Sequence, residues 1–272
     1  IYKRGGYFYL MLAEGGTGYD HCVSFMRATE ISGPYEADPD GPLITARDRP
    51  EAGLQRAGHG GYVETVDGRH FITHLCSRPI AGTKCSPMGR ETAIQEIIWN
   101  DAGWPRLKYP ETALEAKQKS RLASEHYIFD GVLHDDFQWL RTPRKEHLFS
   151  LEDSPGKLRL FGRNSIGSFF HSALVARRQT HYAYRAETCM SFRPNNFQQM
   201  AGLTSYYNAH KFYYLYVSCD ESNNRHLAVM SCLAEQSLSA DYPLAGEEII
   251  LPDEGDIFLA VNVYGTSLTF EY

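Results

Sequence analysis

The stretch Gly-Tyr-Val-Glu-Thr-Val-Asp-Gly-Arg-His-Phe-Ile-Thr-His-Leu-Cys, residues 61–76, decides the fold of the N-terminal part of this 272-residue chain. Asp67-Gly68 is a strong signal for a two-residue hairpin turn, because aspartate and glycine tolerate the positive backbone φ angles that this turn requires. The runs on either side, residues 61–65 and 70–76, are typical of strands. The stretch therefore predicts a β-hairpin.

Further strand-like runs surround this hairpin. They are residues 7–13, 21–28 and 92–99. A turn-rich segment at 100–105 follows the last of them, and a loop rich in Pro, Asp and Gly at 32–58 separates two groups of strands. Short strands joined by tight turns at this spacing favour a sandwich or the blades of a propeller. We predict one all-β domain over residues 1–110.

The pattern changes after this domain. Residues 111–125 are rich in Ala, Glu, Lys and Leu, so we expect residues 111–135 to be an interdomain connection that contains a short helix. Strand patterns return from residue 136, and residues 183–192 alternate with Tyr184, Ala186, Thr188 and Met190 on one face. We predict a second all-β domain over residues 136–272, most simply a β-sandwich.

Composition excludes some functions. The net charge is −6, without the basic patch that neutralises phosphates, so we expect no nucleic-acid partner. No run approaches the roughly 20 apolar residues of a membrane-spanning helix, so we expect no membrane partner. The adjacent pair Arg177-Arg178 suggests a structural salt bridge. Six scattered cysteines and the lack of an Asn-x-Ser/Thr acceptor favour a reducing, cytoplasmic compartment.

Two residues are the candidates for binding a ligand. His59 lies in Ala-Gly-His-Gly-Gly, residues 57–61, in a predicted loop, and Arg90 follows Gly89 in residues 85–95. Glycine leaves room for a ligand to approach the backbone, so both suit a neutral, hydroxyl-rich or anionic ligand. The alternatives are a histidine satisfied by backbone and a local ion pair of Arg90 with Glu91 or another acid.

No other cluster suggests chemistry. A zinc site built from His70, His74, Cys76 and Cys85 lacks the Cys-x-x-Cys spacing of structural zinc sites, so we expect neither metal nor cofactor. Carboxylate pairs are the signature of sugar hydrolysis. The candidates in the first domain are Glu14, Asp20, Glu64 and Asp67, and no pair among them stands out. The turn explains Asp67.

Several long motifs together resemble a known family. They are Ile1-Tyr2-Lys3, residues 13–19 (Ala-Glu-Gly-Gly-Thr-Gly-Tyr), Ala57-Gly58-His59, residues 85–93 (Cys-Ser-Pro-Met-Gly-Arg-Glu-Thr-Ala) and Gly103-Trp104-Pro105. In this order they resemble the later blades of a β-xylosidase of glycoside hydrolase family 43. Residues 172–178, 187–189 and 197–203 are similar to that group's concanavalin-like C-terminal domain.

The resemblance implies a partial five-bladed β-propeller followed by an incomplete β-sandwich. It implies hydrolysis of xylosides with inversion, by an aspartate base, a glutamate acid and a second aspartate that tunes the acid. The family's pocket histidine and arginine fall on His59 and Arg90. The three family carboxylates would precede Ile1, so we assign no catalytic residue here. We expect the chain to be an interior piece of a longer polypeptide and to be inactive alone.

Three hypotheses follow. The first is part of an exo-β-1,4-xylosidase acting on xylo-oligosaccharides, with α-L-arabinofuranosidase activity as an alternative in the same family. The second is a carbohydrate-binding β module without catalysis, and the third is a fragment with no separate role. The expected partners are the oligosaccharide and the remainder of the same polypeptide. The sequence leaves open a homo-oligomer and a calcium ion near His59.

Overall fold

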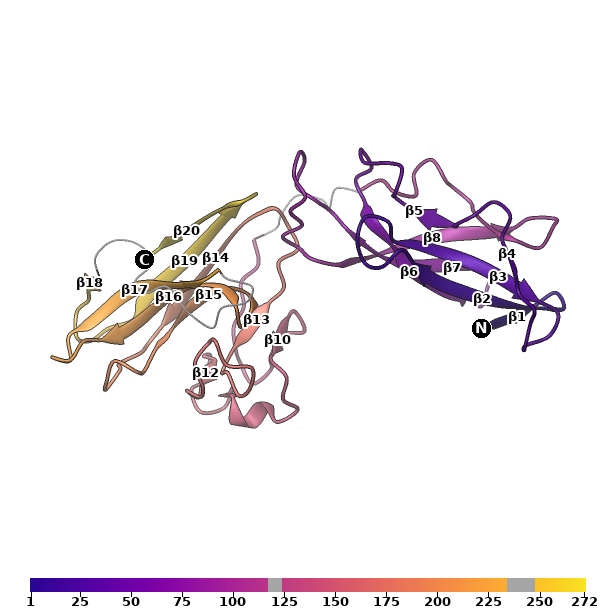
Figure 1. Cartoon of the computed structure of the whole chain (residues 1–272). Coiled ribbons are helices and arrows are strands. Elements are labelled where there is room, and N and C mark those ends of the chain that lie inside the picture. Colours follow the sequence, from indigo (N-terminus) through magenta and orange to yellow (C-terminus); the bar gives the residue numbers. More distant parts are fainter. Residues whose placement is uncertain (117–123, 234–247) are drawn as a thin grey trace. The chain divides into compact units, whose positions relative to one another are not determined.

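A computed structural model describes residues 1–116, 124–233 and 248–272. The chain divides into two compact units, residues 1–121 and 122–272, and each is described here by itself. In both units the described regular structure consists of strands, apart from one single 3-10 turn (Figure 1). The prediction of an all-β fold is therefore confirmed.

The first sheet of the N-terminal unit is an antiparallel meander. Its strands are β1 (Tyr2–Arg4), β2 (Tyr7–Glu14), β3 (Cys22–Ala28), β4 (Glu36–Ala37) and β5 (Ile44–Thr45). The order is β1-β2-β3-β4, and β5 also pairs with β3. Strands β2 and β3 pair without interruption from Phe8 opposite Ala28 to Glu14 opposite Cys22.

The second sheet contains the hairpin that the sequence predicts. Its strands, in order, are β6 (Gln55–Glu64), β7 (His70–Ser77), β8 (Glu91–Trp99) and β9 (Pro105–Leu107). At the hairpin turn, Gly68 has φ +77°, and the Thr65 amide donates to the Arg69 carbonyl at 2.9 Å. The predicted loop 32–58 was too long, since β4, β5 and the beginning of β6 lie within it.

Each of these two sheets has the form of a propeller blade, and their facing sides enclose the core of the unit (Figure 1). The buried core residues are Tyr9, Val23, Phe25, Ile44, Ala46, Leu54, Ala57, Ile72, Cys76, Ile97, Trp104 and Leu114. Both sheets contribute to this cluster, so neither can bury its apolar face without the other.

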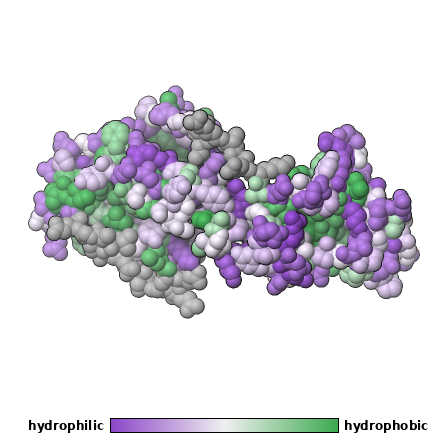
Figure 2. Space-filling model, turned by 90° about the horizontal axis from the view of Figure 1, so that it is seen from above, coloured by the Kyte–Doolittle hydropathy of each residue, from purple (hydrophilic) through white to green (hydrophobic). Residues whose placement is uncertain are grey.

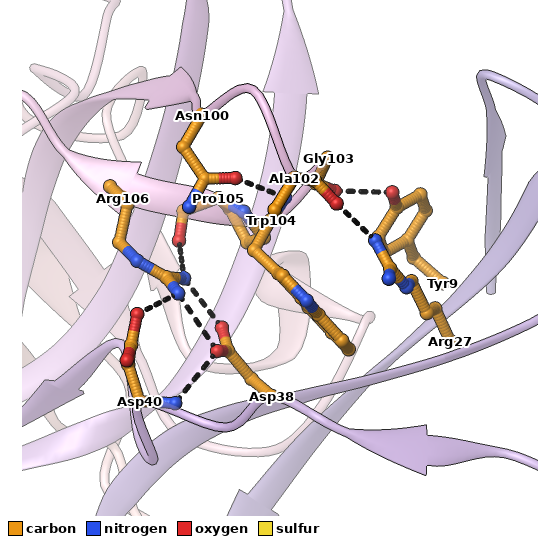
Figure 3. A network of polar contacts seen from close by, with 10 residues as sticks. All are labelled: Tyr9, Arg27, Asp38, Asp40, Asn100, Ala102, Gly103, Trp104, Pro105 and Arg106. Atoms are coloured by element: carbon orange, nitrogen blue, oxygen red, sulfur yellow. Dashed lines mark hydrogen bonds and ion pairs between the residues drawn. The ribbon is translucent and has the colours of Figure 1, made fainter.

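A network of polar contacts ties the first sheet to the β8–β9 turn (Figure 3). The Arg106 guanidinium donates to both carboxylate oxygens of Asp38, at 2.6 and 2.9 Å, and also contacts Asp40. Arg27 donates to the Ala102 carbonyl at 2.5 Å, and its guanidinium carbon lies 4.2 Å from the centre of the Trp104 ring. The network thus joins the first sheet to the β8–β9 turn, although the two segments are far apart in sequence.

The C-terminal unit contains a four-stranded sheet and a three-stranded sheet. One has the order β15-β16-β17-β18, and the other has the order β14-β19-β20. The strands are β14 (Ala183–Met190), β15 (Ala201–Asn208), β16 (Lys211–Cys219), β17 (Arg225–Cys232), β18 (Ile249–Ile250), β19 (Ile257–Tyr264) and β20 (Ser267–Glu271).

These two sheets form the predicted sandwich. Leu215, Val217 and Leu227 of the four-stranded sheet pack against Ile257 and Leu259 of the three-stranded sheet. On β14, Tyr184, Ala186, Thr188 and Met190 are partly buried and alternate with exposed residues. The predicted alternation of this strand is confirmed.

Small elements precede the sandwich. They are β10 (Phe137–Trp139), β11 (Phe149–Ser150), β12 (Arg159–Leu160), β13 (Val175–Arg177) and the single 3-10 turn η1 (Lys145–His147). β10 pairs with β13, and Arg177 makes ion pairs with Glu125 and Asp136, as expected of a structural arginine.

The expected helix over residues 111–125 is wrong where it can be checked, because residues 111–116 form turns and residues 124–125 have no regular structure. Residues 117–123 lie outside the described part. In the ranges that the structure describes, no helix has the length and apolar character to cross a bilayer.

On the visible face, hydrophobic residues gather in a few patches within a mostly hydrophilic or neutral surface (Figure 2). Phe170, Tyr207 and Tyr264 are among the exposed apolar residues of the C-terminal unit. All six cysteines are free, and four of them are buried, as expected of thiols in apolar strands. Cys85 and Cys189 are the two exposed thiols.

Candidate functional site

His59 does not lie in a loop, as the sequence suggested, but within β6. The pairing of β6 with β7 passes from Gln55–Ser77 to Gly58–Leu75 and then to Gly61–Thr73. Each step takes three residues of β6 for two residues of β7, so β6 contains two successive bulges. Bulges are common near functional sites because they change the direction of a side chain.

Each bulge contains one ionisable residue in a strained backbone conformation. Arg56 has φ +53° and His59 has φ +52°, a region that residues other than glycine rarely adopt. The two lie three residues apart, which is also the spacing of the bulges. They therefore occupy equivalent positions in a repeated backbone irregularity. Such strain persists only where the surrounding structure imposes it, and it is typical of ligand-binding positions.

The glycines around His59 serve packing rather than ligand access. A Cβ atom on Gly58 would lie 2.3 Å from Cδ2 of the His21 ring. A Cβ atom on Gly60 would lie 3.1 Å from Val23 Cγ1 and 3.2 Å from Ile72 Cγ2. His21, Val23 and Ile72 therefore fill the space that suggested room for a ligand, and the expectation of open backbone beside Gly58 and Gly60 is wrong.

His21 lies behind His59 and was missed in the sequence. Its ring is 3% exposed and lies 6.5 Å from the His59 ring, centre to centre, in an edge-on arrangement. His21 Nδ1 lies 3.0 Å from the Glu14 carbonyl oxygen and donates to it, because a carbonyl can only accept. Its Nε2 is buried and has no hydrogen-bond partner. No local signal reveals this role, which depends on a contact between two sheets.

The other histidines of this sheet do not join His59 in a metal site. Burial lowers the pKa of His74, whose Nδ1 lies 3.0 Å from the Leu75 carbonyl oxygen. His70 Nδ1 lies 2.8 Å from the Tyr62 hydroxyl. Among the residues with described positions, no three His, Cys, Asp or Glu side chains are grouped so as to hold a metal ion.

Arg90 lies at the same end of the second sheet as His59. It is exposed, and it follows Gly89, which has φ +67°, and precedes the first residue of β8. Residues 91 and 76 are register partners, as are residues 58 and 75, so β7 lies between the two candidates. Two strand spacings amount to about 10 Å. The structure thus brings His59 and Arg90 to one sheet end from segments about thirty residues apart.

Glu91, the acid that follows Arg90, forms an ion pair with Arg78. Arg78 donates to both carboxylate oxygens of Glu91, from Nε at 2.8 Å and from Nη2 at 2.7 Å. This two-pronged contact fixes the beginning of β8 immediately after Arg90. Sequence reasoning did not single out Arg78.

The acidic candidates are scattered over the unit. Asp67 accepts from Thr65 and Arg69 in the hairpin turn, and these bonds hold its pKa below the usual value. Asp20 pairs with Arg47 at 3.5 Å, and Glu64 lies 3.9 Å from Arg4. Glu14 is exposed at the end of β2. Three of the four carboxylates therefore have local partners that account for them by a structural role.

Comparison with known proteins matches both units. Residues 1–105 match the family "Glycosyl hydrolases family 43", and residues 128–272 match "Beta xylosidase C-terminal Concanavalin A-like domain". The chain is similar to "Xylosidase/arabinosidase 43B" of Humicola insolens, with 45% identity over 100% of this chain and 52% of that protein. It is 37% identical to "Beta-xylosidase" of Bacillus subtilis, over 97% of this chain and 52% of that protein.

A solved structure gives the same result. The crystal structure of xylan beta-1,4-xylosidase from Bacillus halodurans C-125 superposes with a TM-score of 0.86 and 36% identity. The match covers 99% of this chain and 52% of that one. The chain thus spans about half the length of the curated relatives that it matches.

Proposed function

The chain belongs to glycosyl hydrolase family 43, and on this premise we propose that it is part of an exo-acting β-1,4-xylosidase that removes terminal xylose from xylo-oligosaccharides. The observation that supports this most directly is the placement of His59, which strained backbone holds against His21 at the sheet end that also presents Arg90. The proposal assigns both side chains to the pocket for the non-reducing xylose.

The two side chains would have different tasks. The His59 ring can donate or accept one hydrogen bond at each nitrogen, which suits a sugar hydroxyl. Arg90 can donate to several hydroxyls, and its charge would lower the pKa of a neighbouring carboxyl group. Neither performs acid–base chemistry in this scheme.

The acid and the base belong, in this proposal, to the remainder of the polypeptide. Hydrolysis with inversion requires two carboxyl groups about 6.5–9.5 Å apart, so that a water molecule fits between the base and the sugar. Partners explain three of the acidic candidates in this chain, so we infer that both groups come from outside it. The isolated chain should then bind xylose but not hydrolyse xylosides.

The test uses the full-length polypeptide that contains this chain. We expect His59→Ala and Arg90→Ala each to lower kcat/KM for nitrophenyl-β-xyloside by about 10- to 100-fold, the cost of a lost hydrogen bond involving a charged or buried group. Arg69→Ala, at the opposite end of the second sheet, is the matched control and should retain activity. Unchanged kinetics in both pocket variants would contradict the assignment.

α-L-Arabinofuranosidase activity is the second candidate. The relative from Humicola insolens is named for both xylosidase and arabinosidase. Nitrophenyl-α-arabinofuranoside should be assayed in parallel, since a higher kcat/KM on that substrate would reverse the preference. A carbohydrate-binding module without catalysis would instead show xylose binding and no turnover by the full-length polypeptide.

A further inference from the structure

A cavity of about 390 Å³ lies beside the bulged half of β6. The residues that line it include Tyr19, Arg47, Gln55, Thr83 and Lys84. The volume falls in the range of small-ligand sites, which begins at about 300 Å³. Arg56, the residue of the first bulge, follows Gln55 directly and faces the Tyr19 ring of this cavity.

Two cationic side chains lie over the Tyr19 ring. The Arg56 guanidinium carbon lies 4.8 Å from the centre of the Tyr19 ring, and Lys84 Nζ lies 5.8 Å from it. Within the described ranges, neither side chain pairs with a carboxylate. Arg47, on the same cavity, differs because Asp20 lies 3.5 Å from its Nε. Two positive charges on one tyrosine ring repel each other, and an anion bound in the cavity beside that ring would reduce this cost.

The backbone positions of both cations are defined by local structure. Arg56 has φ +53°, and its Nε is buried without a hydrogen-bond partner. Lys84 belongs to a tight turn in which the Ile80 amide donates to the Cys85 carbonyl at 2.8 Å. The Cys85 amide in turn donates to the Thr83 hydroxyl at 3.0 Å. A buried N–H group without a partner is costly, which points to a ligand that would accept from it.

We propose that this cavity binds the carboxylate of an acidic sugar unit, such as a uronic acid side chain on the oligosaccharide. The inference rests on the proposed function, because Arg56 lies three residues from His59 on the same strand and one ligand could reach both. The planar arginine fork matches a carboxylate, lysine adds a point charge, and the tyrosine ring offers apolar surface for a sugar ring. The site would select acidic oligosaccharides over neutral ones.

The experiment is a calorimetric titration of the 272-residue chain with two probes, xylotriose and xylotriose that carries one glucuronic acid. We expect the acidic probe to bind about tenfold more tightly, as one charge-assisted hydrogen bond would provide. Lys84→Ala and Arg56→Gln should each remove most of this difference. Raising the salt concentration should reduce it, while affinity for the neutral probe stays constant.

Lys108→Ala is the matched control, because Lys108 also lies over a tyrosine ring, at 5.4 Å, but pairs with Glu96. It should leave the preference unchanged. Binding of the acidic probe that depends on Lys84 supports the inference even if xylotriose alone does not bind. Equal affinities for the two probes overturn it, and so does inorganic phosphate that competes as well as the acidic sugar.

The proposed function fails on a different result. That result is normal activity of the full-length His59→Ala and Arg90→Ala variants, whichever probe binds. The two proposals can therefore be rejected separately.

Discussion

The two sheets of the N-terminal unit are built on different principles. In the first sheet, β2 and β3 pair in unbroken register, and their alternate residues pack into the core. In the second sheet, β6 pairs with β7 through two bulges, each with an ionisable residue at positive φ. Regular pairing places alternate side chains in the core, whereas a bulge changes the direction of the side chains within it. Candidate chemistry in this unit gathers where the ladder is broken.

The contact between Gly58 and His21 offers the strongest way to break this arrangement. We expect Gly58→Ala to lower the free energy of unfolding by about 3 kcal/mol, because the new methyl group would overlap the His21 ring. Urea titration measures the loss. Gly18→Ala is the control, since a Cβ atom there meets nothing within 4 Å. An equal loss in both variants would mean that backbone freedom, not the His21 contact, requires glycine at 58.

Breaking the polar network of Figure 3 would measure how much the contact between the two sheets contributes to stability. Arg106→Gln should cost about 2 kcal/mol, because it leaves the Asp38 carboxylate, whose side chain is 3% exposed, without its charged partner. Lys108→Gln, which removes a more exposed pair with Glu96, should cost less than about 0.5 kcal/mol. Similar melting curves for both variants would show that the two sheets stay together without this contact.

Because the backbone at His59 is strained, a suitable substitution there should increase the stability of the fold. His59→Gly should raise the free energy of unfolding by about 1 kcal/mol, because glycine adopts φ +52° without steric cost. The same replacement in regular pairing, Ser24→Gly on β3, should lower it by about 1 kcal/mol. If both variants lose stability, the bulge conformation of His59 is not strained. The stabilised variant should also lose xylose binding under the proposed function.

The smallest effect concerns pH. Burial lowers the pKa of His74, so the folded state takes up this proton at lower pH than the unfolded chain does. The unfolded chain then holds more protons below its own pKa of about 6.5, and stability falls as the pH drops through that region. His74→Gln should reduce the loss of stability between pH 7.5 and 5.5 by up to about 1 kcal/mol. Unfolding titrations at the two pH values measure the effect. If the wild-type chain and the His74→Gln variant lose the same stability on acidification, this role is contradicted.

The strands were predictable and the site's geometry was not. Asp67-Gly68 and the alternation along β14 are local signals, so the hairpin and the sandwich strand could be found from the sequence. The short strands β10 and β13 gave no such signal, because they pair across about forty residues. Local helix propensity was a poor guide at residues 111–116, because the backbone forms turns there and not a helix.

His59 and Arg90 were found through their motifs, but the reason given for the glycines was wrong. Their spacing suggested open backbone, whereas the space beside Gly58 is filled by His21, the residue that precedes β3. His21, Arg56 and Arg78 were missed for the same reason, since their roles come from contacts that no short stretch of sequence contains. The roles of His59 and Arg90 themselves remain predictions.

Strand β6 has ten residues and its partner β7 has eight. The two extra residues correspond to the two bulges, so the strand accommodates Arg56 and His59 as insertions between rungs of the ladder rather than as replacements for core residues. The two positions can therefore be varied together without changing the register of the paired residues on either side. A small combinatorial library at these two positions would be a direct route to changing which sugars this fold accepts.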